Sequence, residues 1–139
     1  MGSKIDVSLI LLTYKSKILL MLLGDNLIIS KDNTWRFIGA VRQKNKSFEE
    51  TIFIEVEKET NIKLDSVELL SSLPHKNGTR NLYHASLTDK HVNSMKRRDG
   101  QLLNFFTLQE ARELPMGKLT RLFVLKHQDL LQKTQIFAN

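Results

Sequence analysis

The chain has 139 residues, of which 41% are hydrophobic and 26% are charged, and its formal net charge is +6 at pH 7. This length and composition indicate a single domain over residues 1–139 with a hydrophobic core, and exclude an intrinsically disordered chain. The chain contains no cysteine, which excludes disulfides and thiolate metal sites, so we expect a cytoplasmic protein. No uninterrupted apolar run approaches the roughly 20 residues of a membrane span, so we expect no membrane partner.

The net positive charge raises the question of anionic partners. Lysines spread over a solvated surface are the simplest explanation, and binding of a phosphorylated small molecule is the alternative. The sequence has no basic-aromatic RNA signature and no recognition-helix pattern, so we do not expect a nucleic acid partner. It carries no signal for oligomeric state, which leaves a homodimer open.

Three stretches rich in β-branched, leucine and aromatic residues predict strands in the first third of the chain. These stretches are residues 6–14, 17–23 and 34–38. The first two flank the short turn Lys15-Ser16, which predicts an antiparallel hairpin. Gly39 follows the third stretch and is expected to end that strand.

A helix is predicted over residues 47–60, and its sequence signals both of its ends. Ser47 and Glu50 have the spacing of a capping box, in which each side chain accepts a hydrogen bond from the backbone of the other residue. Asn61 is expected to end the helix, because asparagine adopts the left-handed conformation more readily than most residues.

The remaining chain alternates between predicted strands and helices. Strands are predicted at residues 62–73, 81–87 and 101–107, and helices at residues 108–114 and 119–132. The polar and basic residues 88–100 predict a loop. This order of elements indicates an α+β fold in which helices cover a sheet.

Glu55 and Glu59 lie one turn apart on the predicted helix of residues 47–60, beside its apolar stripe. Like charges at this spacing destabilise a helix by roughly 0.2–0.5 kcal/mol, so a positive partner is expected nearby. Lys58 and a divalent cation are the two candidates, and a solvated acidic face is the simpler alternative. Mg²⁺ typically binds one or two carboxylates and fills its other positions with water and substrate phosphates.

Residues 39–62 resemble the Nudix box. That motif has a glycine, five residues, a glutamate, seven residues, and then Arg-Glu-aliphatic-any-Glu-Glu-any-Gly-aliphatic. The matching positions are Glu55, Val56, Glu59 and Ile62. The differing positions are Ala40, Lys46, Ile54, Lys58 and Asn61, which replace glycine, glutamate, arginine, glutamate and glycine in that order. The likeness extends beyond the box, because TWRFIG at residues 34–39 and the segment 99–115 resemble the family's flanking elements.

The resemblance implies a Nudix-like α/β/α sandwich with a mixed sheet between helices. In that family the box carboxylates bind Mg²⁺ or Mn²⁺ for pyrophosphate hydrolysis, which implies catalytic and metal-binding roles for Glu55 and Glu59. Asp99 lies where a remote acid is common in the family. The first glutamate and the arginine of the box form a charge pair in the family, and here Lys46 and Ile54 replace both.

Two functions follow from this resemblance. The first is Mg²⁺-dependent hydrolysis of a nucleoside-diphosphate-linked or related phosphorylated substrate, weakened by the box substitutions. The second is a catalytically inactive Nudix domain that binds a nucleotide or phosphorylated ligand and has lost the metal. Arg42, Lys46 and Lys58 are expected to contact substrate phosphates, with Lys58 substituting for part of the metal charge. The alternatives are a solvated basic loop at residues 41–46 and a Lys58 that complements the negative end of the helix. A purely structural or protein-interaction domain is the third function that the sequence leaves open.

Overall fold

The computed structural model describes residues 4–23, 34–75, 77–98 and 101–131. These residues form six strands and four helices, where the sequence predicts six strands and three helices. The chain divides into two compact units, Met1–Leu12 with Ile38–Lys96 and Thr13–Phe37 with Arg97–Asn139. The prediction of one domain over residues 1–139 stays a prediction. No helix within the described ranges is long and apolar enough to cross a bilayer.

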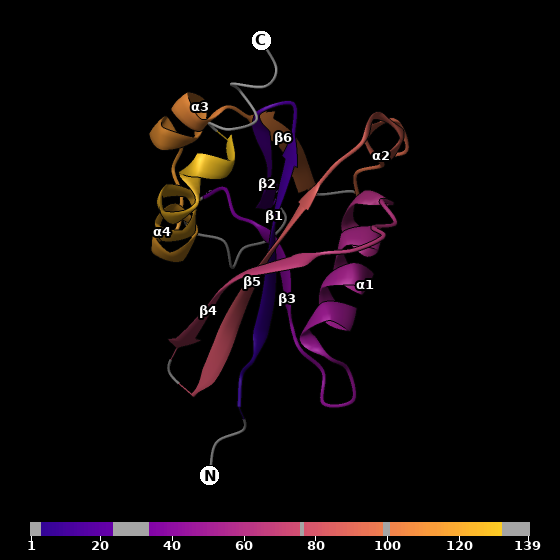
Figure 1. The fold of residues 1–139 in the computed structure, drawn as a ribbon, viewed down its shortest axis with the longest axis vertical. Coiled ribbons are helices and arrows are strands. Elements are labelled where there is room, and N and C mark those ends of the chain that lie inside the picture. Colours follow the sequence, from indigo (N-terminus) through magenta and orange to yellow (C-terminus); the bar gives the residue numbers. More distant parts are fainter. Residues whose placement is uncertain (1–3, 24–33, 76, 99–100, 132–139) are drawn as a thin grey trace. The chain divides into compact units, whose positions relative to one another are not determined.

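The first unit is built on β1 (Val7–Tyr14), whose last two residues belong to the second unit. β1 pairs antiparallel with β3 (Ile38–Val41) and neighbours β5 (Gly78–Ser86), which pairs antiparallel with β4 (Glu68–His75) (Figure 1).

Gly39 lies within β3 and does not end a strand. It faces Leu9 of β1 in the strand register, and a Cβ at Gly39 would lie 2.6 Å from the carbonyl oxygen of Ser8. Glycine is therefore required here for the close approach of two backbones. The predicted strand over residues 34–38 is wrong in its position, since the regular strand starts at Ile38.

The predicted helix forms as α1 (Phe48–Thr60), which packs along β3 (Figure 1). The predicted capping box is confirmed, since the Ser47 hydroxyl accepts the Glu50 N–H at 3.0 Å and the Glu50 carboxylate accepts the Ser47 N–H at 2.9 Å. The Ser47 backbone N–H lowers the pKa of the Glu50 carboxyl, and the Ser47 hydroxyl lowers it to a smaller extent. Asn61 ends the helix at φ 66°, as predicted.

The prediction of a loop over residues 88–100 is wrong, because α2 (Asp89–Asn93) forms there. Thr88 caps this short helix by accepting the His91 N–H at 3.1 Å, and the His91 ring nitrogen Nδ1 accepts the Thr88 N–H at 3.1 Å. Histidine takes the role that glutamate or glutamine has in the usual capping box. The usual sequence signature of a capping box therefore does not reveal this helix start.

The second unit contains β2 (Lys17–Leu23) and β6 (Gln101–Phe106), which pair antiparallel. The predicted turn is confirmed, with φ values of 48° at Lys15 and 65° at Ser16. In place of a strand, Trp35 and Arg36 form isolated bridges with Met116 and Met21.

Two further helices complete the second unit, α3 (Leu108–Glu113) and α4 (Lys118–Lys126). The Trp35 ring packs edge-on against Phe106 with their centroids 4.8 Å apart, and its backbone N–H donates to the Pro115 carbonyl at 2.9 Å. α4 ends at Lys126 because His127 departs from helical geometry, and the chain is helical again over residues 128–131. The predicted helix over residues 119–132 is therefore interrupted at His127, and its last residue lies outside the described residues. Phe123 is the largest fully buried side chain of this unit.

We predict that Ser47→Ala destabilises the protein by about 1 kcal/mol, because the Glu50 N–H loses its side-chain acceptor. Urea unfolding followed by circular dichroism measures this change. Ser66→Ala is the control, since Ser66 is exposed outside the helices, and its effect should stay within about 0.5 kcal/mol. Equal stability of the Ser47→Ala variant and the wild type would contradict the role of this cap.

We predict that Gly78→Ala destabilises the protein by about 2 kcal/mol or more, because overpacking forces the backbone to move. A Cβ at Gly78 would lie 1.9 Å from the Ile5 carbonyl oxygen, and this oxygen belongs to the main chain. Gly117→Ala is the matched control, since no atom lies within 4 Å of the Cβ that it would add. Thermal unfolding of both variants checks the expectation, and a similar loss in the two would refute it.

Candidate functional site

The candidate site lies in the first unit, on α1 and the loop that precedes it. Glu59 lies on the buried side of α1, with a relative exposure of 2%, and Glu55 is half-buried one turn earlier. Ile52 and Val56, also fully buried, flank the two carboxylates along the same side of the helix. The predicted position of both carboxylates beside the apolar stripe thus holds in the structure.

Hydrogen bonds anchor the C-terminal end of α1, the turn that carries Glu59. The Asn61 side chain donates to the Ser94 carbonyl at 3.0 Å, and the Lys96 N–H donates to the Thr60 carbonyl at 2.9 Å. The two partner residues, Ser94 and Lys96, lie in the short segment that follows α2. The last turn of α1, where unpaired carbonyls would otherwise be left, is therefore attached to this segment.

The N-terminal end of α1 is attached to β1 in a similar way. The Ser8 hydroxyl of β1 donates to the Phe48 carbonyl at 2.7 Å, and Ser8 is fully buried. A buried hydroxyl with such a partner fixes the position of the helix relative to the strand, because breaking the bond would leave a polar group unsatisfied. The two ends of α1 thus determine where Glu55 and Glu59 lie.

A hollow of about 240 Å³ lies where the loop of residues 42–46 meets α1. Its lining residues are Ala40, Val41, Gln43, Lys46, Thr51, Ile54 and Glu55. Ile54 and Val41 are large apolar residues at 50% and 58% exposure. The structure thus brings together Lys46, Ile54 and Glu55, three residues that the resemblance to the Nudix motif singles out.

The Arg42 guanidinium is oriented by contacts within the protein, and the phosphate contact predicted for it stays a prediction. Its guanidinium forms an ion pair with Asp6 at 2.8 Å and donates to the Lys46 carbonyl at 3.0 Å. The Arg42 hydrogen bond holds the pKa of the Asp6 carboxyl below its ordinary value. Asp6 was not predicted as a site residue, because it lies 36 residues from Arg42 along the chain.

Lys58 and Asp99 are the two remaining residues predicted for the site. Lys58 is exposed in the last turn of α1, where a positive charge complements the helix dipole. Asp99 lies outside the described residues, so its predicted role as a remote acid stays a prediction.

Within the described ranges, no group of three or more His, Cys, Asp or Glu side chains is arranged to hold a metal ion. Glu59 is almost inaccessible to solvent, whereas Mg²⁺ keeps several water or phosphate ligands. The described side chains therefore do not fit a preformed magnesium site.

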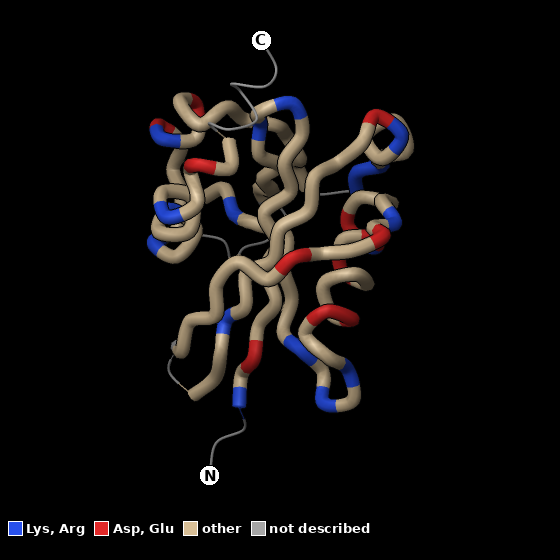
Figure 2. Tube along the Cα trace, viewed as in Figure 1, with Lys and Arg blue, Asp and Glu red and all other residues tan. Residues whose placement is uncertain are grey.

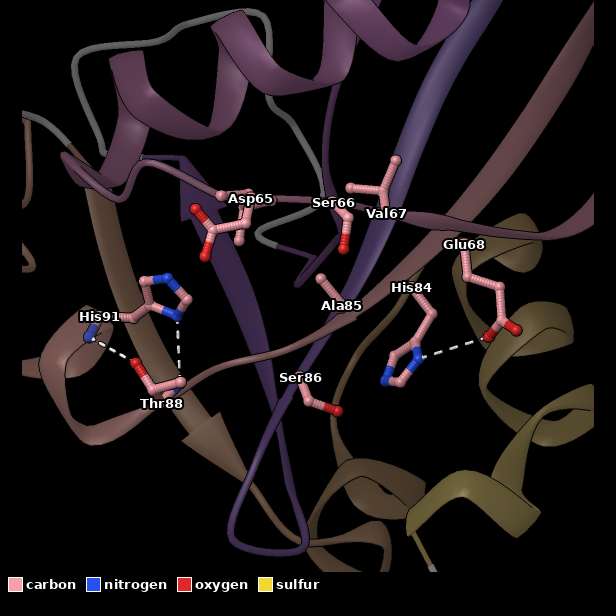
Figure 3. A pocket seen from close by; sticks show the side chains of 10 residues that line it. Asp65, Ser66, Val67, Glu68, His84, Ala85, Ser86, Thr88 and His91 are labelled. Atoms are coloured by element: carbon pink, nitrogen blue, oxygen red, sulfur yellow. Dashed lines mark hydrogen bonds and ion pairs between the residues drawn. The ribbon is translucent and has the colours of Figure 1, made fainter.

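A second hollow of about 370 Å³ lies between the start of β4 and the end of β5 (Figure 3). His84 and His91 both line it, although neither has the sequence spacing of a metal site. His84 Nδ1 lies 4.0 Å from a Glu68 carboxylate oxygen, and His91 Nδ1 accepts the Thr88 N–H of the α2 cap. The His91 ring therefore serves the cap of α2.

Comparisons with solved structures identify the fold of this chain. No protein-family model and no curated protein matches this sequence. Among solved structures, the MutT Nudix hydrolase of Burkholderia pseudomallei has a TM-score of 0.72 and 16% identity, over 91% of this chain and 99% of that one. A Nudix-family hydrolase of Clostridium perfringens has a TM-score of 0.70 and 14% identity, over 94% and 99%.

The Nudix domain of Shewanella oneidensis NrtR, solved with ADP-ribose, has a TM-score of 0.70 and 13% identity, over 94% of this chain and 90% of that one. At these identities the likeness establishes the fold alone. The prediction of an α+β chain with a mixed sheet and helices is confirmed, and the chain has the Nudix fold.

Proposed function

We propose that this chain is a Nudix-fold domain that binds a nucleotide or related phosphorylated ligand, with little or no remaining hydrolysis. The observation that carries this proposal is the charge at the box positions. Lys46 and Lys58 take places that the Nudix motif gives to carboxylates, while Glu59 is only 2% exposed. The box has thus lost negative charge where a metal would need it and gained positive charge that suits a phosphate directly.

Lys46 is the residue we assign to the ligand phosphate. It lines the hollow of about 240 Å³ beside α1, together with Ile54 and Val41. An ammonium at the edge of an exposed apolar surface can bind an anionic group while the apolar side chains contact the rest of the ligand. Lys58, exposed on the same helix, adds a second positive charge. Arg42 contributes to this site by holding the loop, since its guanidinium already contacts Asp6.

ADP-ribose is the first ligand to test. It was bound to the NrtR Nudix domain, which shares this fold, and its diphosphate offers the negative charge that Lys46 would require. We further propose that the protein acts in the cytoplasm, as the absence of cysteine suggests. A homodimer stays open and is measured by size-exclusion chromatography with light scattering.

Metal-dependent hydrolysis is the second candidate. It is favoured by the retention of Glu55 and Glu59, which keep the box spacing on α1. Because the described donors do not fit a preformed magnesium site, we derive no catalytic step through a metal. The two candidates differ in whether a phosphorylated ligand is turned over or only bound.

We predict that ADP-ribose binds the wild-type protein and that Lys46→Glu weakens its affinity by about tenfold or more. Reversing the charge removes a charge-assisted contact of about 1.5–3 kcal/mol and adds repulsion. Isothermal titration calorimetry measures the dissociation constant, and higher salt should weaken the wild-type affinity.

Lys90→Glu is the matched control for this test. Lys90 is exposed on α2, does not line the hollow beside α1, and changes the net charge by the same amount. Its dissociation constant should stay within about twofold of the wild type, since distant exposed charges are screened. Equal losses in Lys46→Glu and Lys90→Glu would show a general charge effect and remove Lys46 from the site.

We predict that nucleoside diphosphate derivatives incubated with Mg²⁺ or Mn²⁺ are turned over slowly or not at all. Release of phosphate-containing products, followed by chromatography, measures this, with Glu59→Gln as the reference for background. Lys58→Glu, which restores the carboxylate of the motif, should raise metal-dependent turnover above the wild type if the lysine is what weakens it. Rapid wild-type turnover that Glu59→Gln abolishes would overturn the proposal and establish the hydrolase.

A further inference from the structure

The loop of residues 42–46 joins β3 to α1 and carries three positive charges, at Arg42, Lys44 and Lys46. Figure 2 shows this run of basic residues in the connection between the two elements. Like charges so close together repel each other and favour an open, mobile chain. Something must hold this loop if Lys46 is to stay at the hollow beside α1.

Arg42 makes the contacts that do so. One guanidinium nitrogen donates to the Asp6 carboxylate at 2.8 Å, and the other donates to the Lys46 carbonyl at 3.0 Å. The guanidinium carbon lies 5.1 Å from the centre of the Phe48 ring, in the first turn of α1. One side chain thus connects the N-terminal segment, the end of the loop and the helix.

Asp6 is itself fixed in position for this role. Its backbone carbonyl accepts the Arg42 N–H at 2.7 Å, and its second carboxylate oxygen accepts the Thr79 N–H at 3.1 Å. The side chain is 11% exposed, against 28% for Arg42, so the pair is partly shielded from solvent. Gly78 permits this arrangement, because its missing side chain lets the backbone of Ile5 approach β5 closely.

The positions of the motif's own charge pair cannot hold the loop. Lys46 and Ile54, which replace the glutamate and the arginine, line the same hollow, and an isoleucine cannot pair with a charge. We propose that the Asp6–Arg42 ion pair is the brace that holds the loop of residues 42–46 against α1 in place of that lost pair. Arg42 and Asp6 are thus positioning residues. Their effect on the ligand through Lys46 rests on the proposed function, whereas the brace itself does not.

Hydrogen exchange of the ligand-free protein tests the brace independently of any binding. Arg42→Lys keeps the charge but loses the two-nitrogen contact, and Asp6→Asn keeps the shape but loses the charge. We predict that each change speeds exchange of the Arg42 and Lys46 amides, which donate to the carbonyls of Asp6 and Gln43, by about tenfold or more. Lys44→Gln, which removes an exposed charge in the same loop, should change exchange by less than about twofold.

A compensating variant tests whether the Asp6–Arg42 ion pair takes the place of the motif's charge pair. Lys46→Glu combined with Ile54→Arg restores the motif's pair across the hollow, and in the Arg42→Lys background it should slow loop exchange back to within about threefold of wild type. Ile54→Arg alone, opposite Lys46, should not restore it. Failure of the combined change would show that the brace does not replace the lost pair.

Peptides from β2, in which Ile18, Leu19 and Leu20 are fully buried, serve as the internal reference for folding. If Arg42→Lys speeds exchange there as well, the protein has lost its fold, and the isosteric Asp6→Asn decides the matter. Loop exchange within about twofold of wild type in a folded Asp6→Asn variant would overturn the brace.

The pH dependence of unfolding gives a second measure of the same pair. The Arg42 guanidinium, the Thr79 N–H and the charge of Lys4 all lower the pKa of Asp6 from its ordinary value of 3.8, and Arg42 has the largest effect. Stabilisation by a group with a lowered pKa is complete above its ordinary value and is lost as the pH falls through its value in the folded protein. The wild type should therefore be more stable than Asp6→Asn at neutral pH, and the two should converge in acid. A difference that persists unchanged below pH 3.8 would contradict the ion pair.

Discussion

The polar backbone groups at the two ends of α1 must find hydrogen-bond partners, and the candidate site depends on how they do. At the N-terminal end Ser47 and Glu50 satisfy each other's backbone, while Ser8 of β1 donates to the first carbonyl of the helix. At the C-terminal end Asn61 turns left-handed and ties the last turn to Ser94. An unsatisfied buried group costs more than a made hydrogen bond contributes. These contacts therefore determine the position and orientation of α1, and with them the positions of Glu55 and Glu59.

Two residues that differ from the Nudix motif lie close together in space. Lys46 and Ile54 are eight residues apart in sequence but line one hollow. Losing only one member of a charge pair leaves a partly buried charge without its partner, whereas losing both avoids that cost. The ion pair between Arg42 and Asp6 is present in the same loop, and it is the contact that we propose holds this loop against α1.

The fold and the activity of this chain are therefore separate questions. The match to Nudix structures at 13–16% identity rests on the arrangement of strands and helices, which tolerates wide changes in side chains. An activity depends on a few side chains, and several of those differ here. We propose binding without catalysis, because ammonium groups such as those of Lys46 and Lys58 can hold a phosphate without a metal.

Local features of this chain could be predicted from the sequence. The hairpin turn, both caps of α1 and most strands follow from interactions between residues close in sequence, so their signals are visible in short segments. The capping role of His91 was missed because histidine is an unusual partner in that motif. The strand around Trp35 was misplaced because its ring packs on Phe106, a distant residue.

Only the tertiary structure could decide what the basic loop does. Arg42 looks like a phosphate contact in sequence, but Asp6 lies 36 residues away along the chain and reaches it through the pairing of β1 with β3 and the close approach of Ile5 to Gly78. The sequence by itself determined the helix and the two carboxylates at its buried side, because helical periodicity is local. Only the folded chain shows that Arg42 pairs with Asp6 and that Lys46 lines the hollow beside α1. These contacts join residues that are far apart in sequence, so no local pattern predicts them.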